Sequence, residues 1–189
     1  KILSLLGLFQ GLVDVDVLRA MSSTDAAWRL DDVESLDRDA GIDLLDRAIR
    51  AGFLPAGKGG YYSIQPSIAW FLKDLFAHYF ATPEDVERAQ KAYASAVGAA
   101  SRFYTVQYAG GKEEMLQLLQ LEEGNLLHAR KLAHEHGWEQ ALMDALQGLS
   151  QLYDQVGRRA AWEAIVAEST GDFSDPQSGG PIQIGRAHV

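Results

Sequence analysis

The sequence contains no cysteine, which excludes disulfides, thiolate catalysis and thiolate ligation of metals. No apolar run approaches the roughly 20 residues that a membrane-spanning helix needs, and no signal peptide is visible. Basic residues are scarce, since 17 Lys and Arg stand against 26 Asp and Glu and the formal charge is -9. This excess of negative charge argues against a protein that neutralises nucleic-acid phosphates or lies on anionic lipid. We expect a soluble, cytoplasmic protein without a nucleic-acid or membrane partner.

Helical spacing of apolar residues recurs along most of the chain and predicts a mainly α-helical protein. Hydrophobic residues make up 47% of the 189 positions, which is ample for packed cores. Proline or a capping residue marks several predicted helix starts, and glycine marks several ends. The starts are Asp14, Asp37, Pro66 and Thr82-Pro83, and the ends are Gly52, Gly110, Gly137 and Gly157.

Residues 1–81 predict a winged helix, with three to four helices plus a β-hairpin. One helix ends near Gln10, one follows the Asp14 cap, and one runs from near Asp37 to Ala51. Phe53 and Leu54 are expected to begin a strand that turns at residues 57–60 and returns through residues 61–64. The helix that Pro66 opens packs beside them.

Residues 82–168 predict an α-helical region of repeats. One long helix follows Thr82, and shorter helices follow the glycine breaks. A group of residues resembles one tetratricopeptide unit, which needs neighbours to bury its faces: Leu146, Gly148, Leu149, Tyr153, Gly157, Arg158, Ala161 and Trp162. We expect a boundary near Ala81-Thr82 between separate packing units.

The two ends of the chain suggest a fragment. Lys1 opens within an apolar run, with no initiator Met. Residues 169–183 predict a flexible tail rich in Gly, Ser, Asp and Pro. Residues 184–189 match the translation of a common sequencing adapter, so we exclude them from the fold as a sequence artefact.

Together these features resemble the region after the nucleotide-binding module in bacterial STAND NTPases of the NB-ARC type, where a winged helix precedes tetratricopeptide repeats. The resemblance implies signal transduction by an ATP-dependent switch. The winged helix would pack on an upstream nucleotide-binding module, and the repeats would bind an unknown ligand, protein or peptide. The residues that carry the resemblance are Leu5 to Phe9, Leu44 to Ala48, Ala51 to Leu54, Tyr62 to Pro66, Glu122 to Leu126, Leu152-Tyr153 and Gly157-Arg158.

The same resemblance implies one cofactor contact. A histidine after the second wing strand of that family approaches the phosphates of the nucleotide, and Gln65 occupies the matching position. Glutamine cannot carry a positive charge, which weakens nucleotide sensing at this position. We expect no cofactor on this part of the chain, whereas ATP or ADP is implied for the upstream module.

Three residue patterns suggest chemistry, but a purely structural interpretation is favoured for each. Residues 52–58 have phosphate-loop spacing, but Gly59 replaces the magnesium-binding Ser or Thr, and a helix precedes the loop where a strand is needed. His128, His134 and His136 fall on different faces of one helix, so we expect no metal site. No catalytic arrangement stands out, so we expect no enzyme activity from these residues, leaving ATPase activity open for a longer protein.

Two alternatives remain open. One is a DNA-binding transcriptional regulator that uses the helix from Asp39 to Ala51, and the other is a tetratricopeptide scaffold without nucleotide switching. Against DNA binding, Asp43 with Arg47 and Asp46 with Arg50 have the i, i+4 spacing at which opposite charges can pair. Lys58 is the only lone cation near the expected wing.

Overall fold

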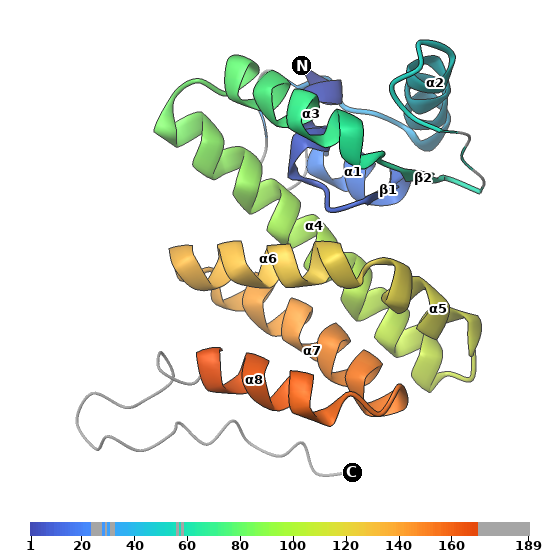
Figure 1. The fold of residues 1–189 in the computed structure, drawn as a ribbon, viewed down its shortest axis with the longest axis vertical. Coiled ribbons are helices and arrows are strands. Elements are labelled where there is room, and N and C mark those ends of the chain that lie inside the picture. Colours follow the sequence, from blue (N-terminus) through green and yellow to red (C-terminus); the bar gives the residue numbers. More distant parts are fainter. Residues whose placement is uncertain (24–27, 29, 31–32, 56, 58, 170–189) are drawn as a thin grey trace. The chain divides into compact units, whose positions relative to one another are not determined.

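A computed structural model describes residues 1–23, 28, 30, 33–55, 57 and 59–169, and these are mainly α-helical (Figure 1). The chain forms two compact units, Lys1–Leu149 and Ser150–Val189. Within the described ranges, no helix has the length and apolar character that crossing a membrane requires. The tail was expected at residues 169–183, but Ser169 is the buried last residue of the final described helix, because its hydroxyl bonds to the Ile165 carbonyl at 2.9 Å. Residues 170–183, the excluded residues 184–189 and Lys58 lie outside the description.

The first unit begins with a 3-10 helix, η1 (Ile2–Leu8), where an ordinary helix was expected. A short strand, β1 (Leu12–Asp14), follows and leads directly into α1 (Val15–Met21). Asp14 caps α1 as predicted, because its carboxylate accepts a hydrogen bond from the Asp16 amide at 2.8 Å. Val17, Leu18 and Met21 are buried, so this helix places its apolar face in the core.

The helix expected from near Asp37 is α2 (Arg38–Arg50), and the Asp37 carboxylate caps it by accepting from the Ala40 amide. Its end explains why the predicted hairpin is wrong. Gly52 takes a positive φ of 80°, and the Phe53 amide bonds back to the Ala48 carbonyl, so Phe53 completes the helix end and is not in a strand.

The strand β2 (Tyr61–Ser63) pairs instead with β1, which lies far earlier in the sequence. The pairing is antiparallel and joins Leu12 to Ser63, Val13 to Tyr62 and Asp14 to Tyr61. Two further hydrogen bonds extend it, from the Val15 amide to the Gly60 carbonyl and from the Ile64 amide to the Gly11 carbonyl. The sheet therefore ties the segment before α1 to the segment before α3.

Pro66 opens α3 (Pro66–Tyr79), which packs closely against η1. The approach depends on Gly7, because a Cβ there would lie 2.5 Å from the Leu72 carbonyl oxygen. Phe80 ends this helix, and Thr82 caps α4 (Pro83–Ala109) by accepting from the Asp85 amide at 3.1 Å. The break at residues 80–82 is therefore present as predicted.

Separate packing on the two sides of this break was also expected, and the structure differs. Helix α1 packs on α4, and the Phe9 and Tyr93 rings meet edge to face at 5.2 Å. One compact unit therefore contains all of residues 1–81 and most of the expected repeat region. The reason is that α4 offers its small and aromatic buried residues to the N-terminal segment as well as to the later helices.

The remaining helices of the first unit follow α4 in sequence (Figure 1). They are α5 (Glu114–Leu121), α6 (Glu123–His136) and the first part of α7 (Glu139–Gln155). Gly148 allows α7 to come close to α4, because a Cβ at this position would overlap the Ser101 hydroxyl. Gly137 ends α6 in the left-handed conformation with φ 66°.

The second unit contains the end of α7 and α8 (Arg159–Ser169). Gly157 turns the chain between them with φ 70°, and the Arg158 amide then bonds to the Tyr153 carbonyl at 2.9 Å. The Arg158 guanidinium lies 4.7 Å from the centre of the Tyr153 ring. These contacts fix the turn that the glycine spacing predicted.

Candidate functional site

A buried polar junction joins the β1 segment to α4 and α6, and Asn125 is its centre. Asn125 is the only asparagine in the sequence, and its side chain is completely buried near the start of α6. Its carbonyl oxygen accepts from the Gln10 amide at 2.7 Å and from the Tyr93 hydroxyl at 3.0 Å. Its amino group donates to the Leu12 carbonyl at 2.9 Å and to Glu122 at 2.6 Å. Every hydrogen-bonding position of the amide is therefore used.

Glu122 lies beside Asn125 and is only 2% exposed. One carboxyl oxygen accepts from Asn125, while the other has no hydrogen-bond partner among the described residues. Burial raises the pKa of Glu122 to about 8, the Asn125 hydrogen bond opposes this rise, and the nearby charge of Asp14 adds to it. At neutral pH Glu122 is therefore mainly a neutral carboxylic acid.

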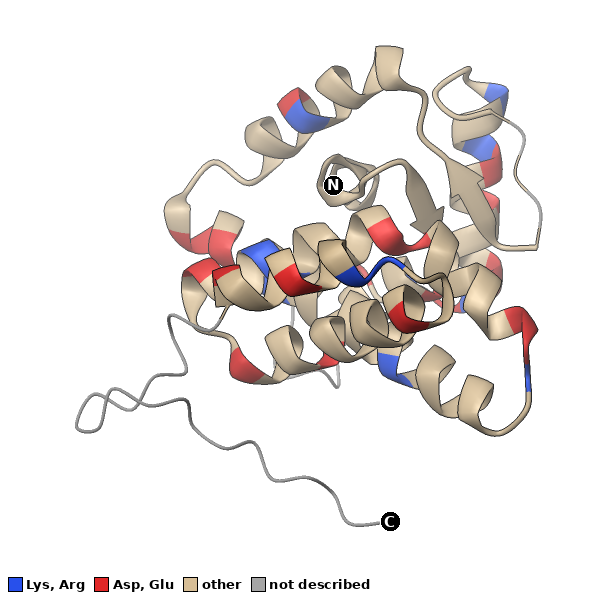
Figure 2. Ribbon diagram, turned by 60° about the horizontal axis from the view of Figure 1, so that its bottom comes forward, with Lys and Arg blue, Asp and Glu red and all other residues tan. Residues whose placement is uncertain are grey.

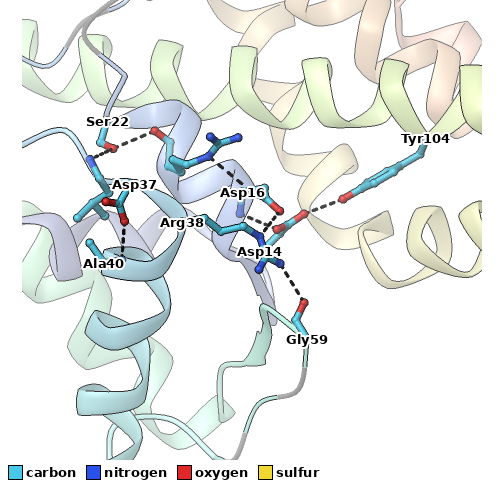
Figure 3. A network of polar contacts seen from close by, with 10 residues as sticks. Asp14, Asp16, Ser22, Asp37, Arg38, Ala40, Gly59 and Tyr104 are labelled. Carbon is cyan, nitrogen blue, oxygen red and sulfur yellow. Dashed lines mark hydrogen bonds and ion pairs between the residues drawn. The ribbon is translucent and has the colours of Figure 1, made fainter.

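Asp14 is the second buried acid of the junction, with 2% of its surface exposed. Besides capping α1, it accepts a hydrogen bond of 2.6 Å from the Tyr104 hydroxyl on α4 (Figure 3). Burial raises the pKa of Asp14, and the hydrogen bonds from Tyr104 and the Asp16 amide oppose that rise. Burial also raises the pKa of Tyr104 and of Tyr61, so both phenols remain protonated donors.

The junction reaches the surface through Asp16 and Arg38 (Figure 3). Arg38 donates to the Asp16 carboxylate at 3.2 Å and to the Gly59 carbonyl at 3.4 Å. About half of each of the two charged side chains is exposed, so this ion pair contributes little to stability. The separate bond from Arg38 to the Gly59 carbonyl connects the start of α2 to the turn that precedes β2.

His128 extends the junction toward η1. Its Nδ1 atom lies 2.8 Å from the Leu8 carbonyl and 3.0 Å from the Gln10 side-chain amide. Burial lowers the pKa of His128, which favours the neutral ring. His136 lies elsewhere, since its ring stacks on Trp138 with centroids 4.5 Å apart. Among the described residues, no group of three or more His, Asp or Glu side chains is placed to hold a metal ion.

Gln65 does not take part in the junction. It is exposed at the N-cap of α3, and its side chain makes no capping hydrogen bond. The segment of phosphate-loop spacing begins at the end of α2, where Gly52 turns the chain. No contact therefore joins Gln65 or the described part of this segment to the Asn125 junction.

The predicted ion pairs along α2 are not formed among the described residues. Asp46 instead accepts a hydrogen bond from the Tyr62 hydroxyl at 3.1 Å. Arg47 and Arg50 line a cavity of about 780 Å³ between α2 and η1, together with Lys1 and Asp43. The four charged residues do lie on one helix with the predicted i, i+4 spacing. The pairing failed in part because Tyr62 on β2 bonds to Asp46, and the helix sequence alone does not reveal this contact.

Sequence reasoning singled out Glu122 to Leu126 as a motif and Asp14 as a cap, but it did not connect them. The available signal was a Glu and an Asn three residues apart at a helix start, within apolar surroundings. Gln10, Tyr93 and Tyr104 join the site through contacts between segments distant in the sequence.

The described residues form a mainly α-helical protein with a two-stranded sheet. Its Asn125 junction is a buried polar site that joins the β1 segment to α4 and α6. Comparisons of the chain with family models, curated proteins and solved structures found no match.

Proposed function

We propose that the chain is a regulatory, protein-interaction module of a bacterial STAND-type signal-transduction NTPase and not an enzyme by itself. In this proposal residues 1–81 act as the winged helix and pack on an upstream nucleotide-binding module that holds ATP or ADP. The later helices act as tetratricopeptide-like repeats that bind a protein or peptide. The protein acts in the cytoplasm, without a nucleic-acid or membrane partner.

The observation that carries the proposal is the Asn125 junction. A single buried amide bonds to the backbone of Gln10 and Leu12 on one side and to Tyr93 and Glu122 on the other. If the N-terminal segment is displaced, α4 and α6 must therefore move with it, or several buried hydrogen bonds must break. This is the mechanical coupling that a switch between a nucleotide module and a sensor region needs.

Exposed aromatic residues supply a surface for the packing partner. Trp70 on α3 is 63% exposed, and Phe71 beside it stacks on Phe53 with ring centroids 5.6 Å apart. Phe53 itself is 38% exposed. Two exposed aromatic side chains beside the half-buried Phe71 supply a contact for a protein partner, because tryptophan is enriched among interface anchors.

The test begins with the coding sequence directly upstream, which should contain a Walker-type motif. Its product, expressed with the present chain, should be retained on the chain in a pull-down. Trp70→Ser should weaken retention about tenfold, as for an interface anchor, and Lys73→Ser should not. An upstream region without that motif would favour the scaffold without nucleotide switching.

A second measurement concerns the nucleotide itself. We predict no submicromolar ATP binding by the chain alone, because Gln65 offers only neutral hydrogen bonds, about half as strong as charge-assisted ones. Isothermal titration calorimetry with MgATP checks this. Submicromolar binding that Gln65→Ala abolishes would contradict the proposal that the upstream module, and not this chain, binds the nucleotide.

A further inference from the structure

The carboxyl group of Glu122 is only partly satisfied. Its Oε1 atom is buried and has no hydrogen-bond partner among the described residues, whereas the other oxygen accepts from Asn125 at 2.6 Å. Glu122 lies between α5 and α6, and its backbone bonds in both helices: the amide donates to the Leu118 carbonyl, and the carbonyl accepts from the Leu126 amide. Because this backbone is fixed, the surroundings of the carboxyl group decide whether the group can hold a charge.

The surroundings of Glu122 contain acids and phenols. Within the described ranges, no basic side chain bonds to its carboxyl group. The ionisable side chains that face it or its neighbouring acid come from β1, β2 and α4, and they are Asp14, Tyr61, Tyr93 and Tyr104. Arg38 acts on Asp14 from a distance and is itself paired with Asp16. A negative charge on Glu122 would therefore lie near a second buried acid, without a cation of its own.

Residues 10–12, which we call the cover segment, lie against the start of α6. The first two of them are exposed, whereas Glu122 is only 2% exposed. The approach is close, because a Cβ on Gly124 would lie 2.9 Å from the Gln10 carbonyl oxygen. Asn125 holds the segment through bonds to the backbone at both of its ends. The exposed cover segment is therefore bonded directly to the buried amide that also holds Glu122.

Ionisation of Glu122 changes the balance of forces at this contact. A buried carboxylate loses its hydration, and the described residues offer this one no donor besides Asn125. Water supplies the missing donors once the cover segment separates from α6, which costs the two bonds between Asn125 and that segment. Burial raises the pKa of Glu122 to about 8, so at neutral pH the protonated form with the segment in place is favoured.

We propose that Glu122 and the cover segment form a proton-controlled latch. With Glu122 protonated, the cover segment stays bonded to Asn125. When Glu122 loses its proton to solvent, the segment separates from α6 while the helices stay folded. The inference deepens the proposed function, since it gives the coupling between the N-terminal segment and the later helices a regulator. It rests on that function only for the signalling consequence of opening.

Amide hydrogen exchange of the whole chain, followed by NMR between pH 7 and pH 8, tests the latch. Each rate is divided by the intrinsic rate at the same pH, which gives a protection factor. We expect the protection factor of the Gln10 amide, which bonds to Asn125, to fall about fivefold across this window. The limit for opening linked to one proton is about tenfold per pH unit. No fall at Gln10 would overturn the proposal.

Low concentrations of urea separate opening of the latch from unfolding of the whole unit. Urea accelerates exchange in proportion to the surface that an opening exposes. We expect urea to accelerate exchange of the buried Val97 amide on α4 and to leave exchange of the Gln10 amide nearly unchanged. An equal urea dependence at both amides would overturn the latch, because Gln10 would then exchange only by global unfolding.

Two matched variants test the role of the proton. Glu122→Gln keeps an acceptor for Asn125 but cannot ionise, so the Gln10 protection factor should stay constant from pH 7 to pH 8. Glu114→Gln, at an exposed position of α5, should keep the fall. The same pH dependence in both variants would overturn the assignment to Glu122.

A third variant opens the latch without a change of charge. In Gly124→Ala the added methyl group would meet the Gln10 carbonyl, so the protection factor of the Gln10 amide should fall about tenfold at pH 7. An unchanged protection factor would contradict the close contact on which the latch depends. Because these measurements use the chain alone, a failure of the latch would leave the pull-down test of the switch unaffected.

Discussion

At the scale of single residues, Asn125 is a completely buried side chain whose amide is fully hydrogen-bonded. Its carbonyl and amino groups together make four hydrogen bonds to groups from β1, its preceding loop, α4 and the start of α6. No apolar residue of similar size can replace them, because each partner would remain buried without a bond. The same geometry makes this residue the most direct test of the junction.

We predict that Asn125→Ala lowers the free energy of unfolding by about 3 kcal/mol or more, since buried unsatisfied groups cost about 1–3 kcal/mol each. Urea unfolding followed by circular dichroism measures this. Gln120→Ala, at an exposed position of α5, is the matched control and should change stability by less than about 0.5 kcal/mol. Similar effects of the two substitutions would contradict the central position of Asn125.

Glu122 predicts a dependence of stability on pH. Its pKa rises from 4.5 in the unfolded chain to about 8 in the folded chain, so the folded state binds more protons between these values. Stability therefore falls as pH rises through this window, by up to about 1.4 kcal/mol per pH unit. His128 acts in the opposite direction, but only below about pH 6.5, because its pKa is lowered by burial.

The clearest window is thus pH 7 to 8, where His128 is neutral in both states. We predict that Glu122→Gln makes stability nearly independent of pH there and stabilises the protein at pH 8, whereas Glu114→Gln on α5 keeps the slope. Thermal unfolding at half-unit pH intervals checks this. Burial also raises the pKa of Asp14 and of the nearby Tyr61, Tyr93 and Tyr104, and the three phenols stay protonated throughout this window.

Some of this detail could be predicted and some could not. The Asp14 and Asp37 caps follow from local chemistry, since a short acid before an apolar helical pattern satisfies exposed amides. The partner of Asn125 could not be found in this way, because Gln10 is 115 positions away. Nothing in the local sequence states which distant backbone a buried amide will meet.

At the scale of helices and strands, the crossing of α4 and α7 depends on Gly148. Alanine normally stabilises a helix interior relative to glycine, by about 1 kcal/mol. Here the added methyl group would overlap the Ser101 hydroxyl, whose own bond goes to the Asp144 carbonyl at 3.1 Å. Overpacking of this kind costs about 1–3 kcal/mol and reverses the sign.

We therefore predict that Gly148→Ala destabilises the protein, as measured by urea unfolding. The double substitution Gly148→Ala with Ser101→Gly should recover stability relative to the sum of the single changes, because it removes the overlapping atoms. Stabilisation by Gly148→Ala alone would mean that the two helices do not approach as closely as described.

The helix breaks were predicted correctly at Gly52, Gly110, Gly137 and Gly157, and the helix starts at Pro66 and Thr82 were also correct. The strand pairing was wrong because the sequence pattern favoured the nearest apolar run, Phe53-Leu54, as the partner of residues 61–64. In the structure that run finishes α2, and the Leu12–Asp14 segment supplies the strand. Pairing between distant segments depends on packing that a short window does not contain.

At the scale of the whole molecule, the formal charge of -9 opposes association with DNA. Acidic residues are found on most of the described helices, with basic residues between them (Figure 2). One observation favours the alternative, since Arg47 and Arg50 on α2 are not in the expected ion pairs with Asp43 and Asp46. Two arginines and the exposed Arg38 remain the main cations of this helix.

We predict that these cations are too few for DNA binding. Non-specific affinity comes chiefly from counterion release and grows with each phosphate neutralised, and Arg38 is already engaged by Asp16. One or two phosphate contacts would leave the affinity below the usual non-specific range of about 0.1 mM to 1 µM at physiological salt. Fluorescence anisotropy of labelled duplex DNA, titrated with the chain across a salt series, measures this. The control variant, Arg47→Gln with Arg50→Gln, should behave as the unchanged chain does. Micromolar binding that this double substitution weakens, with a shallower salt dependence, would place a DNA-binding regulator ahead of the switch module, because only direct phosphate contacts produce both changes.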